Sequence, residues 1–149
     1  MAAQLSLWFA AAWWASLSFL GSVVVPSLFM HLPTPAIAGA MAAHLFSAQS
    51  WVSCACAGAL LVLNLRKHDE LVFGAERPKI AWFPLLAALG LLSTVLVEWV
   101  VAPRIVARED LQLWHRLGSA MYFLQWLCAI AIFQLLLRRQ AVARARWHA

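Results

Sequence analysis

Residues 81–101 read AWFPLLAALGLLSTVLVEWVV, and Glu98 is the only charged residue among them. A bilayer core about 30 Å thick is crossed by about 20 helical residues at a rise of about 1.5 Å per residue. The stretch is therefore long and apolar enough for a transmembrane span. It must be a helix, because lipid cannot satisfy the hydrogen bonds of an open backbone.

Three further stretches have the same character. The predicted spans are 5–31, 36–65, 80–103 and 111–137. Of the whole chain, 64% is hydrophobic and only 11% is charged, whereas about a quarter of a soluble domain is charged. We predict one all-α membrane domain over residues 1–149, a bundle of four transmembrane helices. The first span is longer than the apolar core of a signal peptide, so we expect it to be retained.

Basic residues mark the orientation of the predicted bundle. Eight of them flank one side of the membrane, namely Arg66, Lys67, Arg77, Lys79, Arg138, Arg139, Arg144 and Arg146, and three flank the other, namely Arg104, Arg108 and Arg116. Lys and Arg accumulate on the cytoplasmic side, so both termini are predicted to be cytoplasmic, with 138–149 as a basic tail at the headgroups. The lipid bilayer, and not nucleic acid, is the expected partner, since no nucleic-acid-binding motif is present.

Small residues line one face of the second span: Ala40, Ala43, Ser47, Ser50, Cys54 and Ala57. Membrane helices approach closely along such faces, so we place this helix centrally. Whether small-residue surfaces also support a homo-oligomer or a membrane-protein partner stays open. Pro26 and Pro103 lie inside the first and third spans and should bend them or free a backbone carbonyl upstream.

Ionisable side chains gather near the predicted outer face. A carboxyl group inside a span costs several kcal/mol unless it faces a partner or a wet cavity, so Glu98 should point inward. Thr94 lies one turn away, and His44 and His115 reach a similar depth from neighbouring helices. We therefore predict a polar cluster of Glu98, Thr94, His44 and His115. The sequence leaves open whether Glu98 is protonated.

Several functions fit this cluster. In a structural or accessory protein it would tie helices together. In a haem protein, His115 with either His44 or His31 would supply the ligands, and in a copper protein His44, His115, Met41 and Met121 would suit Cu(I), a soft ion. In a transporter, Glu98 would be a proton-linked group on a solute path. No nucleophile, base and orienting acid form a catalytic arrangement, so no catalytic residue is assigned and the interpretation favours a non-enzymatic protein.

Four stretches together resemble one family: GSVVVPSLFMHLP (21–33), AGAMAAHLF (38–46), VEWVVAPRIVARED (97–110) and LWHRLGSAMY (113–122). They are similar to the bacterial branch of the transmembrane-protein-205-like family, also called domain of unknown function 4149. The resemblance implies a four-helix bundle in a bacterial inner membrane and brings no settled reaction or substrate. Four-helix copper-resistance and haem-binding membrane families look similar in layout, so a cofactor stays under consideration.

Overall fold

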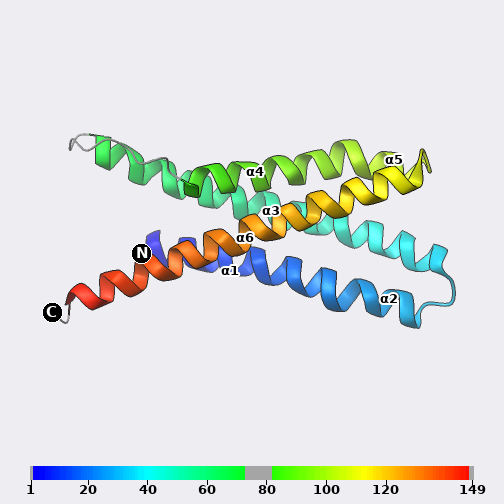
Figure 1. Cartoon of the computed structure of the whole chain (residues 1–149), viewed down its shortest axis with the longest axis horizontal. Coiled ribbons are helices and arrows are strands. Elements are labelled where there is room, and N and C mark those ends of the chain that lie inside the picture. The colour runs from blue at the N-terminus through cyan, green and yellow to red at the C-terminus, as the bar shows by residue number, and fades with distance from the viewer. Residues whose placement is uncertain (1, 73–81, 148–149) are drawn as a thin grey trace.

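The computed structural model describes residues 2–72 and 82–147 (Figure 1). Their backbone forms four long helical rods. The elements are α1 (Ala2–Phe19), the π-helical turn η1 (Leu20–Val24), α2 (Val25–His31), α3 (Pro35–Val72), α4 (Trp82–Leu96), the π-helical turn η2 (Val97–Val101), α5 (Ala102–Val106) and α6 (Leu111–Trp147). The segments Ala3–His31, Pro35–Asn64, Trp82–Val106 and Leu111–Ala141 are long and apolar enough to cross a membrane, which confirms the predicted four-helix membrane bundle.

Two helices continue beyond the predicted ends of their spans. α3 runs to Val72 and α6 to Trp147, whereas the apolar runs predict ends near 65 and 137. Hydropathy marks where a chain leaves lipid, but Arg, Lys, Gln and Ala are good helix formers in water as well. The basic tail predicted at 138–149 is therefore helical as far as residue 147.

The four rods form a square bundle. α1 and α4 each pack against both α3 and α6, so α1 lies diagonally from α4 and α3 from α6. The first and third rods run in the same direction, and the two chain ends lie toward the end of the bundle where α3 finishes and α4 begins (Figure 1). The turns after α2 and α5 lie at the opposite end. Which end faces the cytoplasm stays a prediction from the basic residues.

Each short turn ends in a side-chain cap. The Oγ1 atom of Thr34 accepts a hydrogen bond from the Ile37 amide at 3.3 Å and so caps the start of α3. Asp110 caps α6 similarly, with Oδ1 3.4 Å from the Leu113 amide nitrogen. The second turn is tight, because Arg108 and Asp110 both adopt positive φ angles, 57° and 33°. These caps fix where the rods meet at the end of the bundle opposite the chain termini.

Both prolines inside spans follow a π-helical turn. Pro26 comes two residues after the end of η1, and Pro103 comes two residues after the end of η2. Proline has no amide hydrogen, and its ring clashes with the carbonyl four residues back. The residue before each proline instead bonds five residues back, Val25 to the Leu20 carbonyl and Ala102 to that of Val97. The predicted disturbance is therefore an inserted residue in each helix, a feature often found at functional sites.

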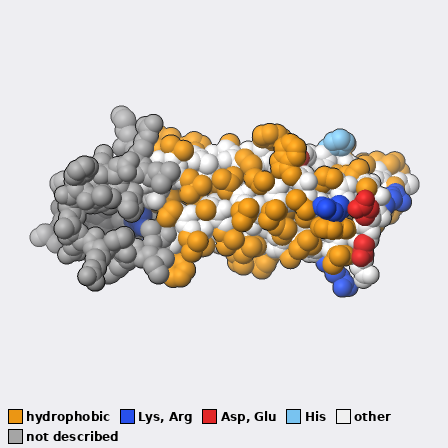
Figure 2. Space-filling model, turned by 90° about the horizontal axis from the view of Figure 1, so that it is seen from above, with side chains coloured by type: hydrophobic (Ala, Val, Ile, Leu, Met, Phe, Trp, Pro, Cys, Tyr) orange, Lys and Arg blue, Asp and Glu red, His pale blue; other side chains and the backbone are white. Residues whose placement is uncertain are grey.

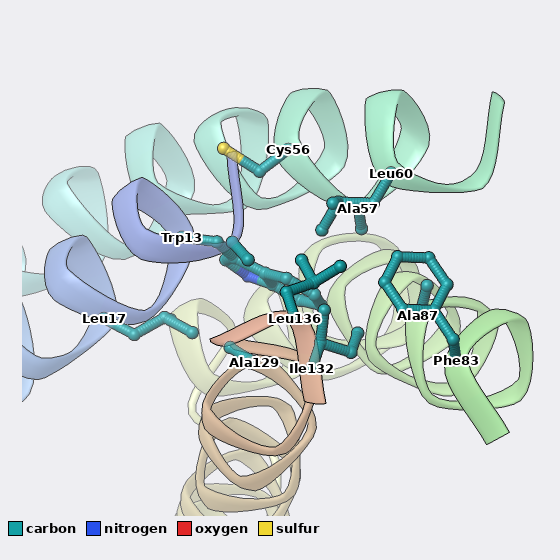
Figure 3. Close-up of a cluster of buried hydrophobic side chains, with 11 residues drawn as sticks. Trp13, Leu17, Cys56, Ala57, Leu60, Phe83, Ala87, Ala129, Ile132 and Leu136 are labelled. Carbon is teal, nitrogen blue, oxygen red and sulfur yellow. The ribbon is translucent and has the colours of Figure 1, made fainter. Parts of the chain in front are cut away.

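The core lies where α1, α3, α4 and α6 meet. Trp13 is fully buried there, and Leu17, Leu60, Ala87 and Ile132 surround it (Figure 3). The further members of the cluster are Ala10, Cys56, Ala57, Phe83, Ala129 and Leu136. Outside, large apolar side chains cover the middle of the bundle, and Arg, Asp and Glu gather at one end (Figure 2). This surface is the one that lipid tails would contact.

Candidate functional site

A band of polar side chains crosses the interior of the bundle. We call it the polar layer, and it consists of Ser16 on α1, Gln49 and Ser53 on α3, Thr94 on α4 and Gln125 on α6. Ser16 is half-buried, whereas the other four are buried, and Ser53 is 0% exposed. All four rods contribute at least one member. Polar groups at such depth are expensive unless they bond to one another.

The members of the polar layer form a continuous chain of hydrogen bonds. The Nε2 group of Gln49 donates to Ser16 Oγ at 3.0 Å and to Ser53 Oγ at 3.2 Å. Ser53 then donates to Gln125 Oε1 at 2.9 Å, and Gln125 Nε2 donates to Thr94 Oγ1 at 2.5 Å.

Backbone carbonyls accept the two ends of this chain. Thr94 donates to the Gly90 carbonyl at 2.9 Å, and Ser16 donates to the Trp13 carbonyl at 3.0 Å. Each hydroxyl and each amide nitrogen of the polar layer therefore donates a hydrogen bond. Such a chain fixes the axial register of helices whose outer faces are uniformly apolar, since sliding one helix would break several bonds at once.

Glu98 lies apart from the polar layer. It is half-buried within η2, and its Oε1 atom accepts a hydrogen bond from Ser47 of α3. A carboxyl group thus sits where a helix contains an inserted residue and bonds to a neighbouring helix, which agrees with the expectation that Glu98 points inward.

The predicted partners of Glu98 are placed differently. Thr94 is buried but bonds to Gln125 and to the Gly90 carbonyl. His44 and His115 are exposed on α3 and α6, and no hydrogen bond or ion pair links either of them to Glu98. Of the predicted cluster, the structure therefore brings two members to the interior and leaves the two histidines on the outer surface.

The remaining candidate ligands also lie near the surface. His31 is exposed, and its Nδ1 atom lies 2.9 Å from the Ser27 carbonyl oxygen. Met41 is exposed and Met121 is half-buried. Within residues 2–72 and 82–147, no group of three or more His, Cys, Asp or Glu side chains could hold a metal ion. Haem and copper binding by these residues stays a prediction.

The two glutamines of the polar layer are functional candidates that sequence reasoning missed. Gln49 lies in the middle of the second span and Gln125 in the middle of the fourth. A glutamine inside an apolar run is costly in lipid and must find a partner. The two glutamines inside apolar runs were therefore a signal in the sequence, although they carry no charge.

A second set of contacts joins α1 to α6. Tyr122 donates a hydrogen bond to the Leu17 carbonyl at 2.7 Å, and the Trp126 indole donates to Ser18 Oγ at 2.8 Å. The Tyr122 ring lies against Gly21, where a Cβ would be 3.2 Å from the ring. Gly118 meets Val101 with the same spacing. Both glycines are thus points of close approach between helices.

These features define a small multi-pass integral membrane protein with polar contacts buried between its helices. A family described as "Domain of unknown function (DUF4149)" matches residues 8–112, and the chain belongs to this family. The match covers the first three spans and the start of α6, so membership of the family called domain of unknown function 4149 is confirmed. No curated protein and no solved structure matches the chain.

Proposed function

We propose that this is a non-enzymatic, structural or accessory protein of the bacterial inner membrane, with both termini in the cytoplasm. Its role would be to present a bundle of fixed shape to lipid and to other membrane proteins. One observation supports this most strongly: the polar layer connects all four rods. Its bonds connect the helices to one another and engage every hydroxyl group of the layer, both amide hydrogens of Gln49 and one amide hydrogen of Gln125.

The Glu98–Ser47 contact fits the same role. This hydrogen bond joins η2 to α3 and lies closer to the proposed outer end of the bundle than the polar layer. The helices are therefore hydrogen-bonded to one another at two depths. In the proposal, Glu98 and Ser47 provide the second tie, whereas His44 and His115 stand at the lipid or headgroup boundary. Imidazoles suit such a boundary, because one part of the ring is apolar and another is polar.

Thermal unfolding in detergent tests the structural role. Gln125→Leu removes the bonds to Ser53 and Thr94, and it should lower the stability by about 1 kcal/mol, a usual magnitude for interhelical bonds in membranes. Gln134→Leu is the matched control, because Gln134 is exposed on the same helix. Equal melting temperatures for the two variants would remove the main support for the proposal.

Proton-linked transport is a second candidate, favoured by the placement of Glu98. An ionisable residue inside a span is a functional candidate by default, and π-helical turns often occur at functional sites. Glu98 combines both features and remains half-exposed. A carboxyl group that can release a proton there, beside the Ser47 hydroxyl, has the chemistry that a proton-coupled path requires.

Proton flux into liposomes separates the two candidates. Glu98→Gln keeps the size of the side chain and a hydrogen-bond acceptor for Ser47 but cannot release a proton. Transport predicts flux in the wild type that Glu98→Gln abolishes, with an unchanged melting temperature. The structural role predicts no flux above that of empty liposomes for either protein. Gln125→Leu serves as a control, because it perturbs packing without removing an ionisable group.

A further inference from the structure

A groove lies between the start of α4 and the later part of α6. Its lining residues are Trp82, Leu86, Ala131, Gln134, Leu135 and Arg138, and its volume is about 320 Å³. Most of this lining is apolar, so the groove suits a hydrocarbon chain better than a hydrated solute. Its place near the ends of two candidate spans, Trp82–Val106 and Leu111–Ala141, puts its mouth close to the membrane surface.

One arginine and one indole ring line the groove at this end. Arg138 lines the groove together with Trp82, and the Arg139 guanidinium lies 5.9 Å from the centre of the Phe83 ring. Trp82 is 63% exposed, as expected of an indole at the boundary between lipid tails and headgroups. The groove therefore offers an apolar floor with positive charge at one end.

We propose that this groove binds one anionic phospholipid. An acyl chain would lie along Leu86, Ala131 and Leu135, and the phosphate would accept hydrogen bonds from Arg138. A guanidinium presents planar paired donors that match phosphate oxygens. Basic pockets between membrane helices are known to hold anionic headgroups in this way. A choline headgroup is disfavoured, because its ammonium would lie beside Arg138 and Arg139.

Native mass spectrometry of the purified full chain with added lipid tests the site. We expect phosphatidylglycerol to bind about fivefold more tightly than phosphatidylcholine, the effect of about one Arg at a membrane surface. Arg138→Gln should remove this preference, and Ala131→Phe, which fills the groove, should weaken binding of both lipids. Arg116→Gln should behave as the wild type, because Arg116 is exposed near the other end of α6.

Three outcomes would overturn the lipid site. The first is a wild type without any preference between the two lipids. The second is an equal loss of phosphatidylglycerol affinity in Arg138→Gln and Arg116→Gln, which would mean that net charge alone attracts the lipid. The third is competition by soluble glycerol 3-phosphate at equal concentration, which would mean that the arginine binds phosphate without the groove.

A different observation supports a second inference, about the two halves of the chain. The buried residues Ser6, Ala10, Trp13 and Leu17 of the first rod have buried counterparts 77 residues later at Phe83, Ala87, Gly90 and Thr94. The same spacing of 77 relates η1 to η2 and Pro26 to Pro103. Burial pattern, π-helical turn and proline thus repeat together in rods that run in the same direction (Figure 1).

The second and fourth rods repeat with a spacing of 76. Gln49, Ser53, Cys56 and Leu60 are buried, and so are Gln125, Ala129, Ile132 and Leu136. Moreover, residues at equivalent positions contact each other. Trp13 packs on Gly90, and the Phe46 and Tyr122 rings meet edge to face with centroids 5.3 Å apart. Equivalent residues can touch only where they lie close to an axis that relates the two halves.

We infer that the chain is a duplicated helical hairpin whose halves are related by a pseudo-twofold axis along the bundle. Parallel internal repeats of this kind occur in membrane proteins. Between the first and third rods a large residue faces a small one, Trp13 against Gly90, whereas between the second and fourth rods two aromatic rings meet edge to face. The halves differ at Glu98, whose equivalent is Gly21, so the carboxyl group belongs to one hairpin alone.

Exchanging residues across the axis tests the duplication. Tyr122→Phe loses the bond to the Leu17 carbonyl and should lower the melting temperature. Adding Phe46→Tyr should restore at least half of that loss, because the new hydroxyl would reach the Thr94 carbonyl, the equivalent acceptor. Similarly, Trp13→Gly with Gly90→Trp should be more stable than either single variant. The inference is overturned if, in both exchanges, the double variant loses as much stability as the sum of its two single variants.

Discussion

The Trp13 ring of α1 packs directly on Gly90 of α4, across the diagonal of the bundle. A Cβ atom on Gly90 would lie 2.5 Å from the Trp13 Cη2 atom and 2.9 Å from Cζ2. Trp13 is fully buried, and its indole nitrogen has no hydrogen-bond partner. The ring is therefore held by shape alone, and Gly90 provides the space for it.

Gly90→Ala should destabilise the bundle. Alanine favours a helix over glycine by about 1 kcal/mol, but the added methyl group must displace Trp13 from a filled core, which costs about 1 to 3 kcal/mol. We expect a net loss of about 1 kcal/mol, measured by thermal or denaturant unfolding in detergent. Gly58→Ala is the control, because nothing lies within 4 Å of a Cβ there. A Gly90→Ala protein as stable as the control would contradict the packing described.

Pro103→Ala should slow backbone hydrogen exchange across η2. The substitution restores an amide hydrogen that can bond an upstream carbonyl, so the amides of 97–103 should become better protected. Exchange measured by mass spectrometry on that peptide checks this. Pro35→Ala is the control, because Pro35 is the first residue of α3, where an amide has no partner within the helix. Unchanged exchange in Pro103→Ala would show that the π-helical turn does not depend on the proline.

The four spans were predictable because lipid imposes a simple rule on sequence. Each apolar run had to be a helix of a certain length. The disturbance at Pro26 and Pro103 also followed from residue type, since proline lacks an amide hydrogen. The helical extensions to Val72 and Trp147 did not, since hydropathy reports the solvent around a helix and not where its hydrogen bonds end.

The site was predictable only in part, because depth along a helix does not fix direction around it. Glu98 and His44 reach similar depths, yet the carboxyl bonds to Ser47 whereas the imidazole is exposed. The π-helical turns add one residue each and so rotate everything beyond them by about 100°. A sequence that shows Pro103 does not show where that extra residue is inserted, so the Ser47 partner of Glu98 could not be derived, although its inward direction could.

Purified protein from copper-replete or haem-replete cells should contain neither cofactor in stoichiometric amount. The physical reason is that His44 and His115 lie exposed on diagonal helices, with no third His, Cys, Asp or Glu grouped with them among the described residues. Metal analysis and the visible spectrum check this together. One bound copper ion or haem per chain, lost in both His44→Ala and His115→Ala, would contradict this expectation and restore the cofactor-binding function.

Reporter fusions should place both chain ends in the cytoplasm. The termini lie toward one end of the bundle, and eight of the eleven Lys and Arg residues belong to that side of the predicted spans. Translocating each of these charges is unfavourable, so the side with more of them stays inside. A reporter that is active only in the cytoplasm should work when fused after Ala149 and fail when inserted between Arg108 and Glu109. Replacing Arg138 and Arg139 with Gln should lower the reporter signal of the Ala149 fusion. A wild-type reporter that works between Arg108 and Glu109 and fails after Ala149 would mean that the bundle is inverted and that Glu98 lies near the cytoplasmic face.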